Sequence, residues 1–216
     1  MTNASSMFTF LPERDCQLCP RLVAFRSKNR GLFPDQFNAP VPAFGPDDAQ
    51  LMVLGLAPGL KGANFTGRPF TGDYAGDLLY STLLKHGFAR GAYDKHKDDG
   101  LELVNCRITN AVRCVPPENK PTTDEENTCR QFLVQELAML PRLKIVLTLG
   151  LVAHKSFLKV MGEKQSAYKF THGGVHNVGG YTMVNSYHCS RYNTQTGRLT
   201  TPMFHSVFDQ IKVLLA

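Results

Sequence analysis

Short apolar runs alternate with amphipathic segments along most of this chain. Four runs have the length and residue types of buried β-strands, at residues 51–56, 107–112, 144–150 and 181–188. Continuous apolar runs of this kind are typical of parallel strands that are covered on both faces. The pattern therefore predicts a sheet whose strands are separated by helices.

The segments between these runs have the periodicity and the end signals of helices. Asp77 is placed to cap a helix that follows the first run, and Thr123 with Glu126 has the spacing of a capping box for a second. The chain ends in an amphipathic segment that Thr200 or Thr201 can cap. This alternation predicts a three-layer α/β/α fold around a central, mostly parallel four-stranded sheet.

The length of 216 residues suits a single domain that spans residues 1–216. In parallel sheets, ligands bind beyond the carboxyl ends of the strands. Three polar or glycine-rich segments follow predicted strands and are expected to meet at that edge: 55–76, 110–114 and 187–197.

Composition narrows the partners. No apolar run approaches the roughly 20 residues that cross a bilayer, and residues 1–15 lack the basic start and apolar centre of a signal peptide. A cytoplasmic protein that does not bind membranes is expected. The formal net charge of +6 and the pI of about 9.0 favour a polyanionic partner such as nucleic acid.

Four of the six cysteines have the spacing of metal ligands: Cys16, Cys19, Cys114 and Cys129. The first two form a CxxC pair, and the other two flank a proline-rich stretch that can bring them together. Such a set can hold a zinc ion or an iron–sulfur cluster, and spacing alone does not separate the two. Cys106 and Cys189 lack partners at ligand spacing and are expected to be buried apolar residues.

The loop at 55–76 contains six glycines. It does not match a phosphate-binding P-loop, since it lacks the Gly-Lys-Ser/Thr ending, and it does not match a dinucleotide fingerprint, since Ala57 occupies a required glycine position. Its glycines let the backbone approach a ligand closely. Arg68 is a candidate to bind a phosphate, Phe70 to stack on a planar ring, and Asp73 to accept a proton or orient a water molecule. The alternative is a surface loop without a ligand.

The last strand ends at His188, which suits either a catalytic role or a place in the core. Hydrogen-bonding side chains follow it that are suited to grip a sugar–phosphate backbone: Ser190, Arg191, Asn193, Gln195 and Thr196.

Five features together resemble the uracil-DNA glycosylase superfamily, and most closely its type-B (fifth) family, which contains an iron–sulfur cluster. They are GLAPG at 55–59, NFTGRPFTGD at 64–73, TNAVRCVPP at 109–117, SYHCSRYNTQTGRLT at 186–200 and the four cysteines. The resemblance implies a base pocket lined by Gly55 and Ala57. In that pocket Phe70 stacks on an extruded base, Asn110 reads the edge of the base, and His188 binds a base carbonyl oxygen.

The resemblance also implies that the four cysteines hold a 4Fe–4S cluster, which ties the segment at about 10–30 to the rest of the chain. The loop at 190–197 presses into the duplex. Sister families carry an acid in the segment equivalent to GLAPG, where this chain has Leu56 and Ala57. Either Asp73 activates water instead, or stabilisation of the leaving base dominates. Cys189 stands where many relatives have proline.

These features predict a monomeric, monofunctional DNA glycosylase. It would flip uracil and other deaminated bases out of DNA and release them by hydrolysis, leaving an abasic site. Asp73, Asn110 and His188 are the expected catalytic residues. The alternative is a non-catalytic DNA-binding module with a structural metal site.

Overall fold

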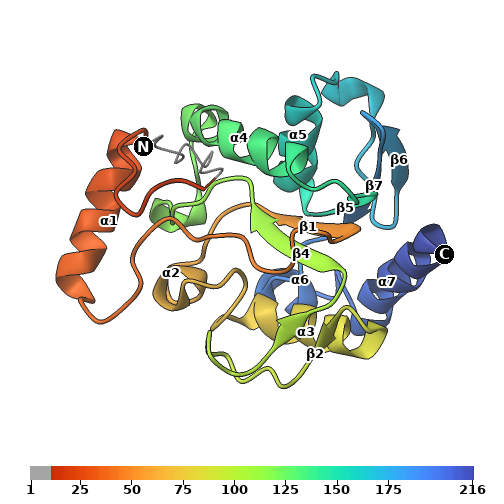
Figure 1. Cartoon of the computed structure of the whole chain (residues 1–216), viewed down its shortest axis with the longest axis horizontal. Coiled ribbons are helices and arrows are strands. Elements are labelled where there is room, and N and C mark those ends of the chain that lie inside the picture. The colour runs from red at the N-terminus through yellow and green to blue at the C-terminus, as the bar shows by residue number, and fades with distance from the viewer. Residues whose placement is uncertain (1–10) are drawn as a thin grey trace, which may run out of the picture.

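A five-stranded sheet forms the centre of the structure, a computed structural model that describes residues 11–216 (Figure 1). The strands, in their order across the sheet, are β4 (Cys106–Asn110), β1 (Leu51–Gly55), β5 (Ile145–Leu149), β7 (Tyr181–Ser186) and β6 (Val175–Val178). The first four are parallel, and β6 pairs antiparallel with β7. The mostly parallel sheet is confirmed, but it has five strands where four were predicted.

Three of the parallel strands are buried at every position because helices cover both faces of the sheet. β1, β4 and β5 are each buried along all five residues, as expected for parallel strands between two helical layers. The additional strand β6 is an edge strand with exposed and half-buried positions. Its VHNV sequence is short and has two polar residues in the middle, so it carries a weaker strand signal than the other four.

The helices form the two outer layers. Their bounds are α1 (Pro20–Leu32), α2 (Ala63–Thr66), α3 (Tyr74–His86), α4 (Thr123–Ala138), α5 (Leu151–Val160), α6 (Arg191–Gln195) and α7 (Thr201–Leu215). Shorter elements are a hairpin of β2 (Ala89–Arg90) and β3 (Glu102–Leu103), and two 3-10 turns at Pro117–Asn119 and Gln165–Ala167. Among the described residues, every helix is too short or too polar to span a bilayer.

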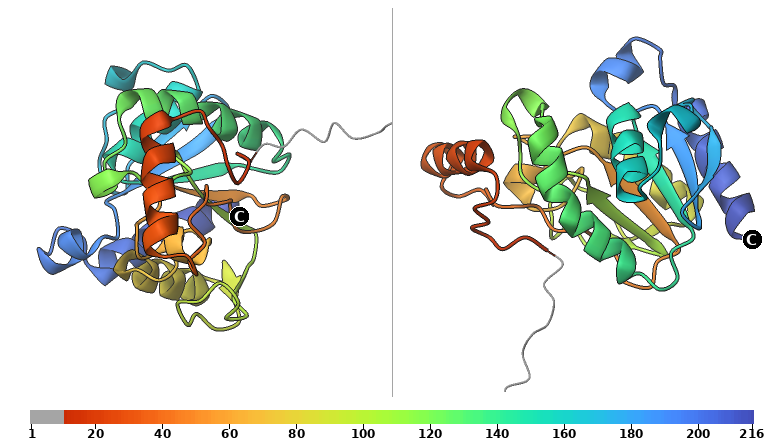
Figure 2. Two further views of the ribbon diagram at one scale, coloured as in Figure 1. Left: turned by 90° about the vertical axis from the view of Figure 1, so that its left-hand side faces the viewer. Right: turned by 90° about the horizontal axis from the view of Figure 1, so that it is seen from above.

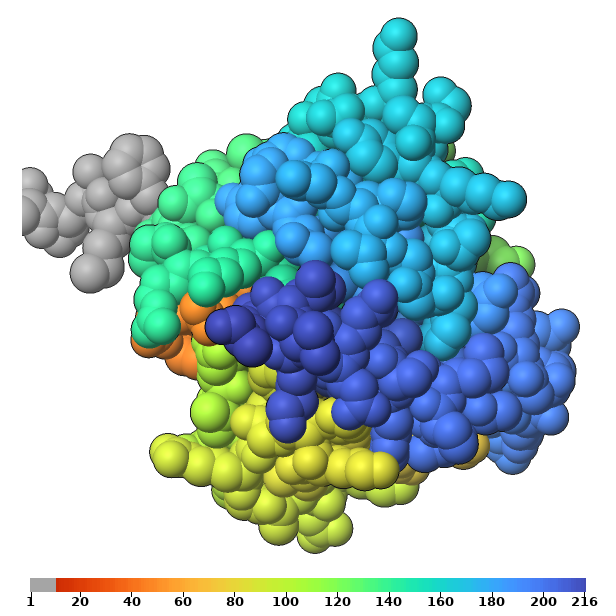
Figure 3. All heavy atoms as spheres, turned by 90° about the vertical axis from the view of Figure 1, so that its right-hand side faces the viewer, coloured from red at the N-terminus to blue at the C-terminus, as the bar shows by residue number. Residues whose placement is uncertain are grey.

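One core lies on each face of the sheet. On one face, α3 and α7 pack Leu79, Leu83 and Phe204 against the strands. On the other, α4 and α5 contribute Leu133 and Phe157. Figure 2 shows these layers from two further directions, and Figure 3 shows α7 at the surface between α3 and the β6–β7 side. The three-layer α/β/α arrangement is therefore the predicted one.

Two helix starts differ from the prediction. The cap of α3 is Asp73 and not Asp77, because the Asp73 carboxylate accepts a hydrogen bond from the backbone N–H of Gly76 at 3.1 Å. The capping box of α4 lies one residue earlier than predicted, at Thr122 and Glu125. Since Asp73 is also a candidate catalytic residue, the start of α3 fixes its place.

A buried ionic network ties β4 and the residues after it to α4. Glu136 is fully buried and accepts hydrogen bonds from the Arg107 Nε at 2.6 Å, from the Thr109 hydroxyl at 2.9 Å and from the Arg113 guanidinium. Burial raises the pKa of Glu136, but the two arginines lower it more, and the net result is a pKa below its usual range. The network therefore holds the carboxyl end of β4 in a fixed position.

Candidate active site

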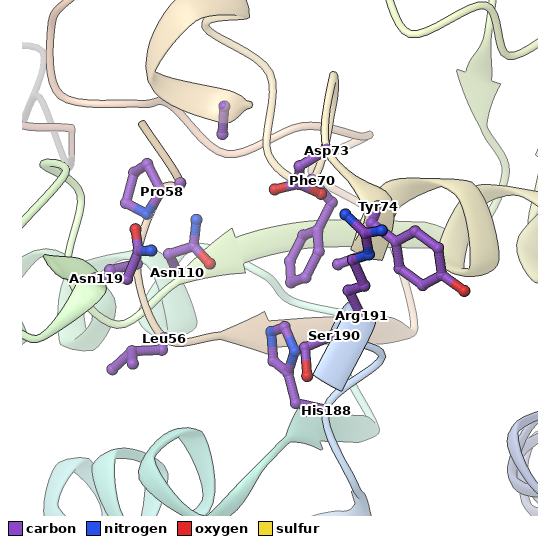
Figure 4. A pocket seen from close by; sticks show the side chains of 14 residues that line it. Leu56, Pro58, Phe70, Asp73, Tyr74, Asn110, Asn119, His188, Ser190 and Arg191 are labelled. Carbon is purple, nitrogen blue, oxygen red and sulfur yellow. The ribbon is translucent and has the colours of Figure 1, made fainter. Parts of the chain in front are cut away.

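A cavity of about 380 Å³ opens at the carboxyl ends of β1 and β4 and just after β7 (Figure 4). This is the sheet edge at which the sequence placed its three informative segments. Its walls come from four parts of the chain. The lining residues with polar or aromatic side chains are Phe70, Asp73, Tyr74, Asn110, Asn119, His188, Ser190 and Arg191.

Phe70 forms one wall of this cavity. Its ring is nearly buried, and its backbone has a φ of 55°, in the left-handed region that non-glycine residues rarely adopt. Gly55 makes room for it: a Cβ at Gly55 would lie 2.7 Å from the Phe70 ring and 2.3 Å from the Asn110 Oδ1. The glycine at the end of β1 therefore allows both side chains to reach the cavity.

His188 enters from the end of β7 and faces the same space. Its ring centroid lies 5.9 Å from that of Phe70, and the two ring planes are 29° apart. The Asn193 side-chain amide donates a hydrogen bond to the His188 carbonyl oxygen at 2.8 Å, which fixes the backbone there. Burial lowers the pKa of His188 to about 4, so the imidazole is neutral at physiological pH.

Asn110 ends β4 and supplies a polar group that lacks a partner. Its Oδ1 is buried and accepts no hydrogen bond from any residue that the structure describes. Buried polar atoms are nearly always satisfied, and an exception beside a cavity indicates a ligand that completes the bond. Figure 4 shows the Asn110 amide beside the space that Phe70 and His188 enclose.

Asp73 lies on the same side of the cavity as Phe70 (Figure 4). One carboxylate oxygen accepts the bond from Gly76 that caps α3. The other lies against Gly59 and Gly62, where a Cβ would approach it to 3.2 Å and 2.7 Å. Burial raises the pKa of Asp73 above its usual value, although backbone hydrogen bonds oppose this shift. A carboxylate with a raised pKa is a better proton acceptor.

The prediction that Arg68 contacts DNA needs correction. Arg68 is only 4% exposed and makes a bidentate ion pair with Asp99, with N–O distances of 2.8 and 2.7 Å. Its guanidinium also lies over the rings of Phe44, Tyr80 and Tyr93. A side chain held in this way cannot reach a phosphate, and its role is to support the loop that carries Phe70.

The other predicted contact residues lie at or near the cavity. Ala57, Ser190 and Arg191 line it. Asn193 supports His188 through the hydrogen bond described above, while Gln195 and Thr196 are exposed on and just after α6. The segment 190–197 is thus a short helix and its flanks, at the rim of the cavity.

Tyr74 and Asn119 line the cavity and were not predicted. Asn119 has a φ of 56° and follows Glu118 with a φ of 55°. Asparagine tolerates the left-handed region better than most residues, so the PPEN sequence carried a signal for a tight turn. Strained backbone of this kind is concentrated at functional sites. Nothing in the sequence placed this turn beside Asn110 (Figure 4).

The four candidate metal ligands gather at a second cavity, between α1 and the start of α4. Its walls include Cys16, Cys19, Cys114 and Cys129. In residues 11–216, no three His, Cys, Asp or Glu side chains converge closely enough to hold a single metal ion. Burial raises the pKa of Cys19 to about 11 and that of Cys114 to about 12. Cys106 and Cys189 are fully buried elsewhere, as predicted.

Fold and site together define a class of protein. It is a three-layer α/β protein with an aromatic- and amide-lined cavity at the carboxyl edge of its sheet, and with a separate group of four cysteines.

The chain belongs to the uracil DNA glycosylase superfamily, whose family model matches residues 42–212. It is 43% identical to the type-5 uracil-DNA glycosylase of Thermus thermophilus, over 92% of this chain and 93% of the relative. The type-5 enzyme of Pyrobaculum aerophilum is 41% identical, over 86% and 83% of the two chains. That of Mycobacterium bovis is 38% identical, over 92% and 78%.

Proposed function

We propose that this protein is a uracil-DNA glycosylase, which hydrolyses the N-glycosidic bond of uracil in DNA and leaves an abasic site. The main support is the geometry of the cavity. The ring centroids of Phe70 and His188 lie 5.9 Å apart at its wall, and the buried Asn110 Oδ1 beside them has no partner among the described residues. The names of the relatives support the same reaction.

The target base has to leave the duplex before it can enter this cavity. Extrusion costs a few kcal/mol, and less for a mispaired base. The 190–197 segment stands at the rim, and its Tyr192 is 72% exposed, so it is placed to fill the space that the base vacates. Contacts from Arg191 and the basic surface to the phosphates offset the remaining cost.

Inside the cavity the base is held by stacking and by its edge. Stacking on Phe70 contributes about 1–3 kcal/mol. The Asn110 amide presents one donor group and one acceptor, which match the edge of uracil. Because the Asn110 oxygen has no protein partner among the described residues, its hydrogen bond is reserved for the ligand.

Cleavage of the glycosidic bond leaves negative charge on the departing base and positive charge on the sugar. His188 is neutral near pH 7 and its ring makes no hydrogen bond to a described residue, so it is free to donate one to the base oxygen. A single preorganised donor of this type contributes about 3–4 kcal/mol. No proton transfer to the base is needed when the donor is a neutral imidazole.

Asp73 acts on the other side of the bond. Its carboxylate is placed to stabilise the cationic sugar and to align the attacking water, and the raised pKa favours proton acceptance from that water. The amide of Asn119 lines the same cavity and offers the water a further hydrogen bond. The absence of an acid at Leu56 and Ala57 leaves Asp73 as the acid of this site.

We further propose that Cys16, Cys19, Cys114 and Cys129 hold a 4Fe–4S cluster. The four thiols line one cavity, as the ligands of a metal centre held by four cysteines do. Thiols with raised pKa values stay protonated until a metal displaces the protons. The cluster would bond the segment at 10–30 to the loop after Cys114, and we assign it no part in the reaction.

A panel of oligonucleotides that each carry one altered base tests the function. Abasic sites are scored after incubation with wild-type protein and with His188→Ala. The proposal is supported if the wild type releases uracil and His188→Ala does not. Release of other deaminated bases by the wild type extends the proposal to those bases. DNA binding without any abasic sites favours the non-catalytic DNA-binding module.

Three separate measurements test the remaining expectations. Iron and sulfide analysis tests the cluster, and gel filtration tests the expected monomer. Fluorescence microscopy of a tagged chain tests the proposed cytoplasmic location.

A further inference from the structure

Arg26 is buried at the cysteine cavity and points at its ligands. It lies in α1, is 3% exposed, and lines the cavity together with the four cysteines. Its Nη1 lies 3.7 Å from the Cys114 Sγ, within hydrogen-bond distance for sulfur, and its Nη2 donates to the Cys16 carbonyl oxygen at 2.8 Å. One side chain thus bridges the first cysteine pair and the second.

The charge of Arg26 lacks an acidic partner. Four arginines are buried in residues 11–216, and three of them form ion pairs with carboxylates: Arg68, Arg107 and Arg113. Within the same residues, no carboxylate lies within ion-pair distance of Arg26, and its Nε makes no hydrogen bond. Residues 1–10 contain no acid either. Burying a cation without a counter-ion is strongly unfavourable.

We infer that Arg26 is the buried counter-ion of a metal centre on the four cysteines, an inference that rests on the metal centre of the proposed function. Four thiolates outweigh the charge of an iron–sulfur core or of a zinc ion, so either centre is a net anion. That anion supplies the partner that Arg26 lacks. The guanidinium in turn hydrogen-bonds a ligand sulfur, and bonds of this type stabilise the bound metal and raise the reduction potential of a cluster.

Charge removal at Arg26 tests this inference, and Lys28 provides a matched control. Arg26→Met and Lys28→Met each remove one positive charge from α1, but Lys28 is exposed. We expect Arg26→Met to release its metal to a chelator faster, with affinity about 10- to 100-fold weaker. If iron is present, its midpoint potential becomes more negative. Lys28→Met matches the wild type in both respects.

Metal analysis of the wild type separates the two proposals. Iron with sulfide supports the cluster. Zinc refutes the cluster but leaves the counter-ion inference testable by the rate of metal release. A wild type that binds no metal refutes both. The inference is overturned if Arg26→Met releases its metal at the wild-type rate and has the wild-type midpoint potential. If Arg26→Met does not fold, Arg26→Lys decides: it keeps the charge, so loss of metal from the folded Lys variant contradicts the role.

Discussion

Replacing Gly55 by alanine is the sharpest test of the site geometry. The new methyl group would lie 2.3 Å from the Asn110 Oδ1 and 2.7 Å from the Phe70 ring. Both contacts are far inside van der Waals distance, so the side chains have to move. Because each is the end of a side chain and not backbone, the strand itself can stay in place. The variant is therefore expected to fold and to lose the site.

The expected loss follows from the two interactions that move. Stacking on an aromatic ring contributes about 1–3 kcal/mol, and a good pair of hydrogen bonds to a base edge contributes about 1–3 kcal/mol. Losing both costs about 2–6 kcal/mol, which corresponds to a decrease of about 30-fold to 10⁴-fold in the rate of uracil release at 1.4 kcal/mol per factor of ten.

The assay is single-turnover release of uracil from a labelled duplex, with thermal unfolding measured in parallel. Gly31→Ala is the matched control, because a Cβ at Gly31 meets nothing within 4 Å; it should keep wild-type activity. If Gly55→Ala releases uracil at the wild-type rate, the proposed contacts of Phe70 and Asn110 with the base are refuted. A large loss of thermal stability would show instead that the strand cannot accommodate the methyl group.

Three further predictions concern the chemistry and the rim. His188→Ala should reduce the single-turnover rate of uracil release by about 10²–10³-fold, while duplex affinity in a gel-shift assay is unchanged. Because burial lowers the pKa of His188 to about 4, the rate of uracil release by the wild type should show no inflection near pH 6.5. Release should rise with pH through the raised pKa of Asp73, since the carboxylate is the active form, and Asp73→Asn should be slower and lack that acid limb. Tyr192→Ala should weaken extrusion from duplex DNA by about 1–3 kcal/mol and affect a single-stranded substrate less; an equal effect on both would contradict a role in extrusion.

The sequence was sufficient for the main strands and for much of the cavity. The four predicted runs became β1, β4, β5 and β7, since each contains apolar or β-branched residues that favour strands. The parallel arrangement then brought Phe70, Asn110 and His188 together from segments far apart in the chain. These residues were found because they lie at or after strand ends, where the topology places ligands.

The misses have a common physical cause, which is dependence on distant partners. Arg68 looked like a phosphate ligand because its sequence neighbours do not show Asp99, which lies 31 residues further along and neutralises it. Asn119 reaches the cavity only because the turn after Cys114 folds back over it. Strand β6 exists because β7 offers an edge, and its own residues carry little strand signal.

The short distance along the chain between the two cavities has a consequence for how oxidation of the cysteines affects the base pocket. Only three residues separate Asn110 from Cys114, and the last of them, Arg113, donates its backbone N–H to the Cys129 Sγ at 3.3 Å. An oxidant that removes the proposed metal centre would weaken this link and make the position of the Asn110 amide, the proposed reader of the base, less fixed. Oxidative damage should therefore first reduce the discrimination between uracil and other bases, while the affinity for DNA is retained.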